Sequence, residues 1–419
     1  MFKKEDLEQE YNDYANGIID PRDFYKILYY LFKIFQVIDG PIPKYTYIVK
    51  LILLSFALSA FSLLSFSFYH GYDTFDIPLI TEAGTYIILL LYKLLIIHCL
   101  KLHRLDYHSM QRTLREDFRF ACTTGEKYRK RFFVHHITTR KIYKMIVTFN
   151  MCVGVGMNLV SILFLLYYLI TNKSGQGKRP LLFPFWYYDI DFTKTPLYEI
   201  AFMYSNFAVL AYAFNFNFYI STQIVWMRQI CCKADIVMWH IEDVIHQIRP
   251  TRNKMEREAF DNLIRQRMRD IVQHHNSMDL LITQYAGVYR KLLSFEQLLS
   301  APLVCFSAYS ICEKWEESGE VNGILLILMM AAIILLFIPS YLCTTLSLKV
   351  TSIAFDCWNI PFWDASTVIR PYLVLIMQKS LQPLPLKVPG LEEFSMLTFS
   401  NKMASAYSFF NMLRQVNRK

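Results

Sequence analysis

Six stretches of 21 to 29 mostly apolar residues constrain this 419-residue chain more than any other feature of its sequence. A helix needs about 20 such residues to cross the hydrocarbon of a bilayer, where the backbone must satisfy its own hydrogen bonds. Charged residues make up only 19% of the chain, against about 25% in soluble proteins. The sequence therefore predicts an all-α membrane protein, with spans at 45–68, 77–100, 145–170, 197–225, 292–312 and 322–342.

A seventh stretch, 394–413, mixes Ser, Asn and Lys with Phe, Met and Leu. A polar last helix can line a pore, and it can also lie on the membrane surface; hydropathy alone leaves both readings open. We take it as a span, which gives seven transmembrane helices. Glu82, Lys93 and Glu296 lie within the other spans, and because a charge is costly in lipid, we expect them to face protein or a wet cavity.

The distribution of Lys and Arg sets the orientation of these spans. Residues 1–44, 101–144 and 226–291 carry six, twelve and eleven, whereas residues 69–76, 171–196 and 313–321 carry none, four and one. The excess predicts a cytoplasmic N-terminus and, with seven spans, an extracellular C-terminus. The sequon at Asn172 falls in an outside segment, so we expect glycosylation there. The polar first 44 residues argue against a cleaved signal peptide, and the inward N-terminus argues against a G-protein-coupled receptor.

These features predict an organisation in six parts. They are a cytoplasmic N-terminal segment (1–44), the first four transmembrane helices (45–225), a cytoplasmic helical loop (226–291), the fifth and sixth helices (292–348), a region with an amphipathic helix over 363–381 (349–393), and a seventh helix (394–419). The segments 226–291 and 349–393 could together form a cytoplasmic platform where subunits meet. The basic run at 127–133 has two readings. It sets topology and extends a helix into the cytoplasm, or it binds anionic membrane lipid.

Catalytic and metal-binding patterns are missing from the sequence. There is no HExxH, GxSxG, Walker or GxGxxG element. The nine cysteines form no CxxC pair, and the ten histidines show no spacing that suits chelation. We therefore expect no metal site, no cofactor and no enzymatic activity.

One face of the predicted last helix is more informative. Ser405, Ser408, Met412 and Gln415 follow the spacing i, i+3, i+7, i+10 and so share a face, and Val416 lies one turn beyond Met412. Around an axis shared with other subunits, such a stripe gives a narrow polar conduit that an apolar ring closes by dewetting. The alternative is that these polar groups only bond to neighbouring helices.

The C-terminal third resembles the insect odorant receptor family over about 60 residues. The resemblance is carried by Ala-Phe-Asp-Cys-Trp at 354–358, the segment 370–377, Lys-Ser-Leu-Gln-Pro-Leu at 379–384 and Ala-Tyr-Ser-Phe-Phe-Asn-Met-Leu-Arg at 406–414. Gustatory receptors have a related ending that needs Gln where this chain has Leu413, so they match less well. No internal repeat and no pair of Gly- or Pro-broken spans supports a secondary transporter.

The resemblance implies a seven-helix subunit of a tetrameric ligand-gated cation channel that works with an obligatory co-receptor. It places Met412 and Val416 at the apolar gate, with Gln415 between them. The ending Met-Leu-Arg-Gln-Val-Asn departs from that of the co-receptor and indicates an odorant-tuning subunit. Arg414, Arg418 and Lys419 would put positive charge at the outer mouth of the pore, so we expect this chain alone to conduct poorly.

The family binds odorants in the outer half of the helix bundle, between the second, third, fourth and sixth helices and near the fifth. By position, the residues of this chain expected there are Tyr86, Ile87, Leu90, Met157, Asn158, Ser161, Leu165, Tyr198, Phe202, Ser205, Asn206, Phe306 and Tyr309. Mostly apolar walls with a few polar groups suit a small volatile.

The sequence is thus interpreted as an odorant-gated, non-selective cation channel subunit in the plasma membrane of an olfactory sensory neuron dendrite. Its partners would be co-receptor subunits, a volatile ligand, membrane lipid and the permeating cations. A gustatory receptor channel of the same architecture and, from another class, a secondary transporter are the alternatives.

Overall fold

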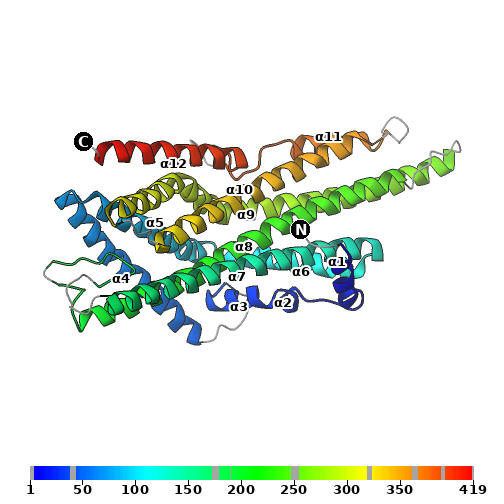
Figure 1. The fold of residues 1–419 in the computed structure, drawn as a ribbon. Helices are drawn as coiled ribbons and strands as arrows, with labels where there is room; N and C mark the ends of the chain where they lie inside the picture. Colours follow the sequence, from blue (N-terminus) through cyan, green and yellow to red (C-terminus); the bar gives the residue numbers. More distant parts are fainter. Residues whose placement is uncertain are drawn as a thin grey trace.

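The computed structural model describes residues 4–37, 44–171, 179–188, 190–246, 254–318, 323–360, 367–387 and 392–417. These residues form helices, with one isolated bridge between Tyr187 and Ile190 (Figure 1). The helices are α1 (Lys4–Tyr11), a 3-10 turn (Asn12–Tyr14), α2 (Pro21–Phe24), α3 (Lys26–Ile34), α4 (Lys44–Thr74), α5 (Ile77–Leu102), α6 (Arg104–Thr123), α7 (Glu126–Thr171), α8 (Leu197–His246), α9 (Lys254–Ser318), α10 (Gly323–Trp358), α11 (Arg370–Ser380) and α12 (Met396–Asn417).

Six of these helices are long and apolar enough to cross a membrane: α4, α5, α7, α8, α9 and α10. They contain the six apolar stretches of the sequence, so the prediction of an all-α membrane protein is confirmed. The seventh predicted span is also a helix, α12, and its 22 residues are long enough to span a bilayer, at about 1.5 Å per residue. It is more polar than the other six because Ser, Asn and Lys interrupt its apolar residues.

Three helices are far longer than a bilayer requires. α7, α8 and α9 have 46, 50 and 65 residues, against about 20 for one crossing. α8 and α9 continue through most of the segment 226–291, so the described part of this segment is helical. In Figure 1 the two helices extend beyond the bundle at the end opposite the C-terminus.

The amphipathic helix expected at 363–381 is shorter in the structure. α11 begins at Arg370, and residues 367–369 form turns, while residues 361–366 lie outside the described part of the chain. Pro371 occupies the first helical turn, where its missing N–H costs no hydrogen bond. The proline therefore fixes the start of the helix more closely than the hydrophobic pattern did.

The largest core joins the N-terminal helices to the inner parts of α6–α10. Trp226, Tyr285 and Tyr289 are fully buried there, together with Phe32 of α3 and Tyr107 of α6. The Tyr107 hydroxyl donates to the Tyr289 hydroxyl at 2.9 Å, and the Tyr289 hydroxyl donates to Thr222 Oγ1 at 2.6 Å. Such a chain satisfies polar groups that would be costly to bury alone.

The basic run 127–133 holds the N-terminal segment against the bundle. Arg129 donates to the carbonyl oxygens of Tyr14 at 2.9 Å and Gly17 at 2.7 Å. Lys130 pairs with Glu8 at 3.3 Å, and the two phenylalanines that end the run are buried in the core. The basic run therefore fixes the N-terminal segment to α7.

Arg140, two turns further along α7, makes the most enclosed of these contacts. It pairs with Glu10, donates to the Tyr14 hydroxyl at 2.6 Å and lies 4.5 Å from the ring centroid of Phe24. Partial burial opposes ionisation of Glu10, but hydrogen bonds and charge from Lys141 and Arg140 outweigh it and lower the pKa of this carboxyl. The stabilisation that this ion pair contributes is therefore fully present above the ordinary pKa of Glu, about 4.3. It is lost as pH falls through the lowered pKa.

We predict that Arg140→Glu releases the N-terminal helices, because it replaces an attraction with a repulsion in a half-buried site. The expected destabilisation is about 2 kcal/mol. It would be measured as faster proteolysis near residues 10–20 of the detergent-solubilised protein. Arg131→Glu is the matched control, since Arg131 makes a looser pair with Glu242 at 3.7 Å. Equal proteolysis of the two variants would contradict the prediction.

Candidate functional site

An apolar cavity of about 400 Å³ lies between α5, α7, α8 and α10. We call it the outer cavity. Pockets for small molecules have mostly hydrophobic walls, so the lining of this cavity suits an apolar ligand. Its walls are Tyr86, Leu89 and Leu90 of α5, Met157 of α7, Ala208, Val209 and Tyr212 of α8, Leu328 of α10, and Phe183 from the segment before α8.

The segment before α8 folds over this cavity. Phe183 is buried, and its ring meets the ring of Tyr86 edge-on, with centroids 4.8 Å apart. The Trp186 backbone N–H donates to Ser67 Oγ at 2.9 Å, and the Trp186 ring stacks on His70 at 3.9 Å. The segment is thus fixed to α4 while it supplies a wall residue to the cavity.

The structure brings three of the thirteen predicted pocket residues together in this wall. Tyr86 and Leu90 are one turn apart on α5, and Met157 faces them from α7; all three are buried. Ile87 packs against the same apolar cluster.

The other predicted residues lie elsewhere in the outer half and are not in the wall of the outer cavity. Several polar ones bond to nearby backbone. Ser205 and Asn206 donate to the Phe202 carbonyl at 3.0 and 2.7 Å, Asn158 donates to the Gly154 carbonyl at 3.2 Å, and Tyr198 donates to the Pro180 carbonyl at 3.0 Å. Ser161 is buried and Leu165 half-buried on α7, while Phe306, which packs over Gly84, and Tyr309 lie on α9.

Sequence reasoning missed Leu89, Phe183, Ala208, Val209, Tyr212 and Leu328. One of them carried a signal: Phe183 belongs to the run Leu-Leu-Phe-Pro-Phe-Trp-Tyr-Tyr at 181–188, which is too apolar to be left in water. The α8 and α10 residues carried none, because both helices are apolar on all sides within the span.

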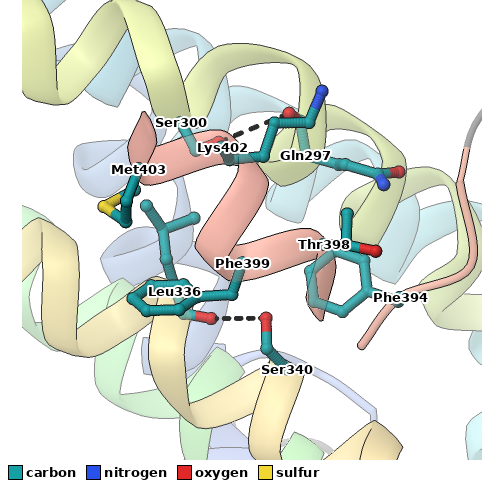
Figure 2. Close-up of a pocket in the computed structure, with 9 residues that line it drawn as sticks. All are labelled: Gln297, Ser300, Leu336, Ser340, Phe394, Thr398, Phe399, Lys402 and Met403. Carbon is teal, nitrogen blue, oxygen red and sulfur yellow. Dashed lines mark hydrogen bonds between the residues drawn. The ribbon is translucent and has the colours of Figure 1, made fainter. Parts of the chain in front are cut away.

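Two further cavities continue from the outer one. The inner cavity, of about 440 Å³, shares Leu89 and Tyr212 with it. A third cavity, of about 260 Å³, lies between α9, α10 and α12 and shares Ser300 and Leu336 with the inner cavity. Figure 2 shows this third cavity, with Phe399 and Met403 of α12 beside Leu336. The three cavities thus form a row with shared walls from the outer half of the bundle to the start of α12.

α12 is attached to α9 and α10 along one side. The Met396 backbone N–H donates to Thr344 Oγ1 at 2.9 Å, and the Phe399 ring meets the Phe337 ring edge-on at 5.8 Å. Near the other end, Arg414 forms an ion pair with Glu316. The opposite side is uncovered in the chain, and its exposed residues include Leu397, Asn401, Ala404, Ser408, Met412 and Gln415.

Most of the predicted pore residues lie on this uncovered face. Ser408, Met412 and Gln415 are exposed, whereas Ser405 is half-buried and donates to the Asn401 carbonyl at 2.9 Å. Val416 is in the last turn of α12, and its side chain lies outside the described set. Arg414 is paired with Glu316, so its positive charge is partly compensated within the chain; Arg418 and Lys419 are not described.

Two other sequence predictions concern sites away from these cavities. Asn172, the predicted glycosylation site, lies outside the described residues. Within the described ranges, no three His, Cys, Asp or Glu side chains are arranged to hold a metal ion.

The helices define a multi-pass membrane protein with apolar cavities inside its bundle. A family model described as 7tm odorant receptor matches residues 76–407, from the start of α5 into α12, so the chain belongs to the odorant receptor family. Membership of a receptor family confirms that this chain is not an enzyme.

Individual relatives are distant. Odorant receptor 67c of Drosophila melanogaster is 25% identical over 191 residues, 46% of this chain and 44% of that protein. Odorant receptor 49a of the same species is 23% identical over 223 residues, 53% of this chain and 52% of that protein. The chain therefore spans about half the length of these relatives.

The fold resembles a solved receptor along nearly the whole chain. The structure of the insect olfactory receptor OR5 from Machilis hrabei in complex with eugenol has a TM-score of 0.67 and 14% identity, covering 94% of this chain and 100% of that one. The structure of the same receptor described without eugenol has a TM-score of 0.63 over the same shares.

We predict that Ala208→Phe fills the outer cavity and raises the half-maximal concentration of an active odorant at least about tenfold, since a bulky ring in the wall would displace the ligand. The measurement is a concentration–response curve in cells with matched surface expression. Leu210→Phe, two residues along α8 at a position 38% exposed and outside the wall, is the control and should leave the curve unchanged. An unaltered response of Ala208→Phe would place the ligand elsewhere.

Proposed function

We propose that this chain is the odorant-tuning subunit of an odorant-gated, non-selective cation channel, acting with co-receptor subunits in the plasma membrane of an olfactory sensory neuron dendrite. The observation that carries the proposal is the row of three cavities with shared walls, which begins at the outer cavity and ends against α12. A ligand in this row lies in a continuous set of side-chain contacts with the helix expected to line the pore.

The coupling has a simple energetic form. A ligand shifts the channel toward the open state only by as much as it binds that state more tightly than the closed one. Leu336 lies in the walls of both the inner and the third cavity, and Phe399 of α12 lies in the wall of the third. A ligand that changes the packing around Leu336 would therefore act on α12 through one intervening layer of side chains.

The uncovered face of α12 supports the pore. An exposed helical face with Ser408, Gln415 and Met412 has polar groups for water and ions, and an apolar side chain that can form a dewetting ring. In this arrangement four subunits surround a central axis with this face of α12 inward, which covers a surface that is exposed in the single chain. The N-terminus lies in the cytoplasm, in agreement with the distribution of Lys and Arg.

The ligand class follows from the outer cavity and from the relatives. The OR5 receptor, which has a similar fold, was solved in complex with eugenol, a small organic molecule. The apolar walls of the outer cavity favour a volatile of comparable kind.

The decisive experiment is whole-cell recording from cells that express this chain with and without an insect odorant co-receptor, challenged with a broad panel of volatiles. We expect odorant-evoked cation current only when both are present. Current from this chain alone would contradict the need for a co-receptor. Silence in both cases, with surface expression confirmed for both proteins, would contradict the channel function.

Met412→Ala should increase the basal, odorant-independent current several-fold, because it shortens the apolar side chain that closes the pore. The comparison is holding current in co-expressing cells before odorant, normalised to surface expression. Met203→Ala is the control, because Met203 on α8 is 74% exposed at a position outside the cavities. Basal currents that match those of the unmodified receptor would remove Met412 from the gate.

A further inference from the structure

The inner cavity contains a carboxyl group in otherwise apolar walls. It lies between α5, α8, α9 and α10, and its apolar lining includes Leu89 and Tyr92 of α5, Leu303 of α9 and Leu336 of α10. Glu296 of α9 faces the same space and is only 8% exposed. The sequence had already indicated that Glu296 must face protein or a cavity, and the outer site and the gate make no use of it.

The two oxygens of this carboxyl differ in their surroundings. Oε1 accepts hydrogen bonds from the Tyr92 hydroxyl and, at 3.1 Å, from the Tyr219 hydroxyl. Oε2 is buried and has no hydrogen-bond partner among the residues that the structure describes. Two tyrosines thus hold the carboxyl in place from α5 and α8 and leave one oxygen unsatisfied.

An unsatisfied buried carboxyl oxygen is costly, and the cost is recovered when a donor reaches it. The inner cavity is the space beside Glu296, and the side chains of Leu89 and Tyr212 lie between it and the outer cavity because they line both. A ligand whose entry moves the Leu89 and Tyr212 side chains aside brings its polar end to Glu296 and keeps its apolar tail between α5, α7 and α8.

We propose that the ligand of this receptor is a volatile alcohol whose hydroxyl group binds Glu296 Oε2 in the inner cavity. This inference rests on the proposed odorant-gated function and adds the chemical class of the ligand. The hydroxyl group of the alcohol donates to Oε2 of the carboxylate, which has only acceptor oxygens. An ether of the same length has no hydrogen to donate and leaves a carboxylate oxygen unsatisfied.

A purely structural role for Glu296 makes a different prediction. If the carboxyl only joined α5, α8 and α9 through Tyr92 and Tyr219, then changing it would weaken responses to all ligands alike. A role in ligand recognition changes the ranking of ligands that differ only in their polar group. The test is therefore built on ratios between matched ligands within one receptor.

The experiment uses this chain co-expressed with the co-receptor, and concentration–response curves for hexan-1-ol, octan-1-ol and their methyl ethers. In the unmodified receptor we expect half-maximal concentrations at least about tenfold lower for each alcohol than for its ether, which is the effect of one hydrogen bond to a charged group. This comparison needs no variant. Equal potency of alcohols and ethers, or responses to other volatiles but to no alcohol, would overturn the inference and leave the channel function intact.

Glu296→Gln sharpens the test. The side chain keeps its shape, its carbonyl oxygen can still accept from the two tyrosines, and its NH₂ group then faces the cavity as a donor. We expect the alcohol-to-ether preference to collapse to within about threefold, because the ether oxygen now has a donor to accept from. Glu82→Gln is the matched control: Glu82 is a carboxyl group on α5 that pairs with Lys314 of α9 at 2.7 Å, outside the inner cavity.

The control should retain the alcohol preference whatever it does to overall sensitivity. A preference for alcohols that is kept in both variants would assign Glu296 a structural role only and overturn the inference.

If Glu296→Gln does not reach the surface, Leu299→Phe provides a second test, because Leu299 lines the inner cavity and not the outer one. It should weaken alcohol responses about tenfold, and unchanged responses would count against a ligand in the inner cavity. A receptor silent to the whole volatile panel would contradict the proposed function itself.

Discussion

In hydrocarbon, a backbone N–H or C=O group has no water to bond with, and the rest of this structure depends on that constraint. Because of it, every span is a helix that makes its own backbone hydrogen bonds. A polar side chain within a span is stable only where it bonds to a group inside the bundle. Glu296 shows the second effect, because it accepts hydrogen bonds from Tyr92 and Tyr219 on two other helices. Since the same helices continue well beyond one bilayer crossing, they also form the inner core that holds the N-terminal segment.

The cavities are the places where this packing is incomplete. α8 and α9 lie against most of the other helices, and the spaces left around them run from the outer cavity to α12. Pro302 of α9 and Pro339 of α10 lie next to wall residues of the two deeper cavities. A proline inside a helix removes one backbone hydrogen bond and favours a bend. Both helices thus have a locally weakened backbone beside the two deeper cavities.

Sequence reasoning could locate features that are repeated along a helix, and it could not anticipate features that depend on one contact. Apolar length predicted six spans, and the periodicity of the last segment placed Ser408, Met412 and Gln415 on one face. It also selected Ser205 and Asn206 for the ligand site, but both donate to the Phe202 carbonyl of their own helix. In a low-dielectric interior a short polar side chain bonds to its own backbone readily, and a helical pattern cannot distinguish that arrangement from one that faces a ligand.

The sequence by itself determined the class of the protein, since hydrophobic length and the segments 354–358 and 406–414 are properties of the chain alone. It also required Glu296 to be enclosed, because a carboxyl group cannot face lipid cheaply. Only the tertiary structure decided which oxygen of Glu296 is left without a partner, that Phe183 closes the outer cavity, and that Arg414 is paired with Glu316. Each of these depends on residues far apart in the chain, and helices with apolar residues on all sides have no sequence signal that sets their rotation.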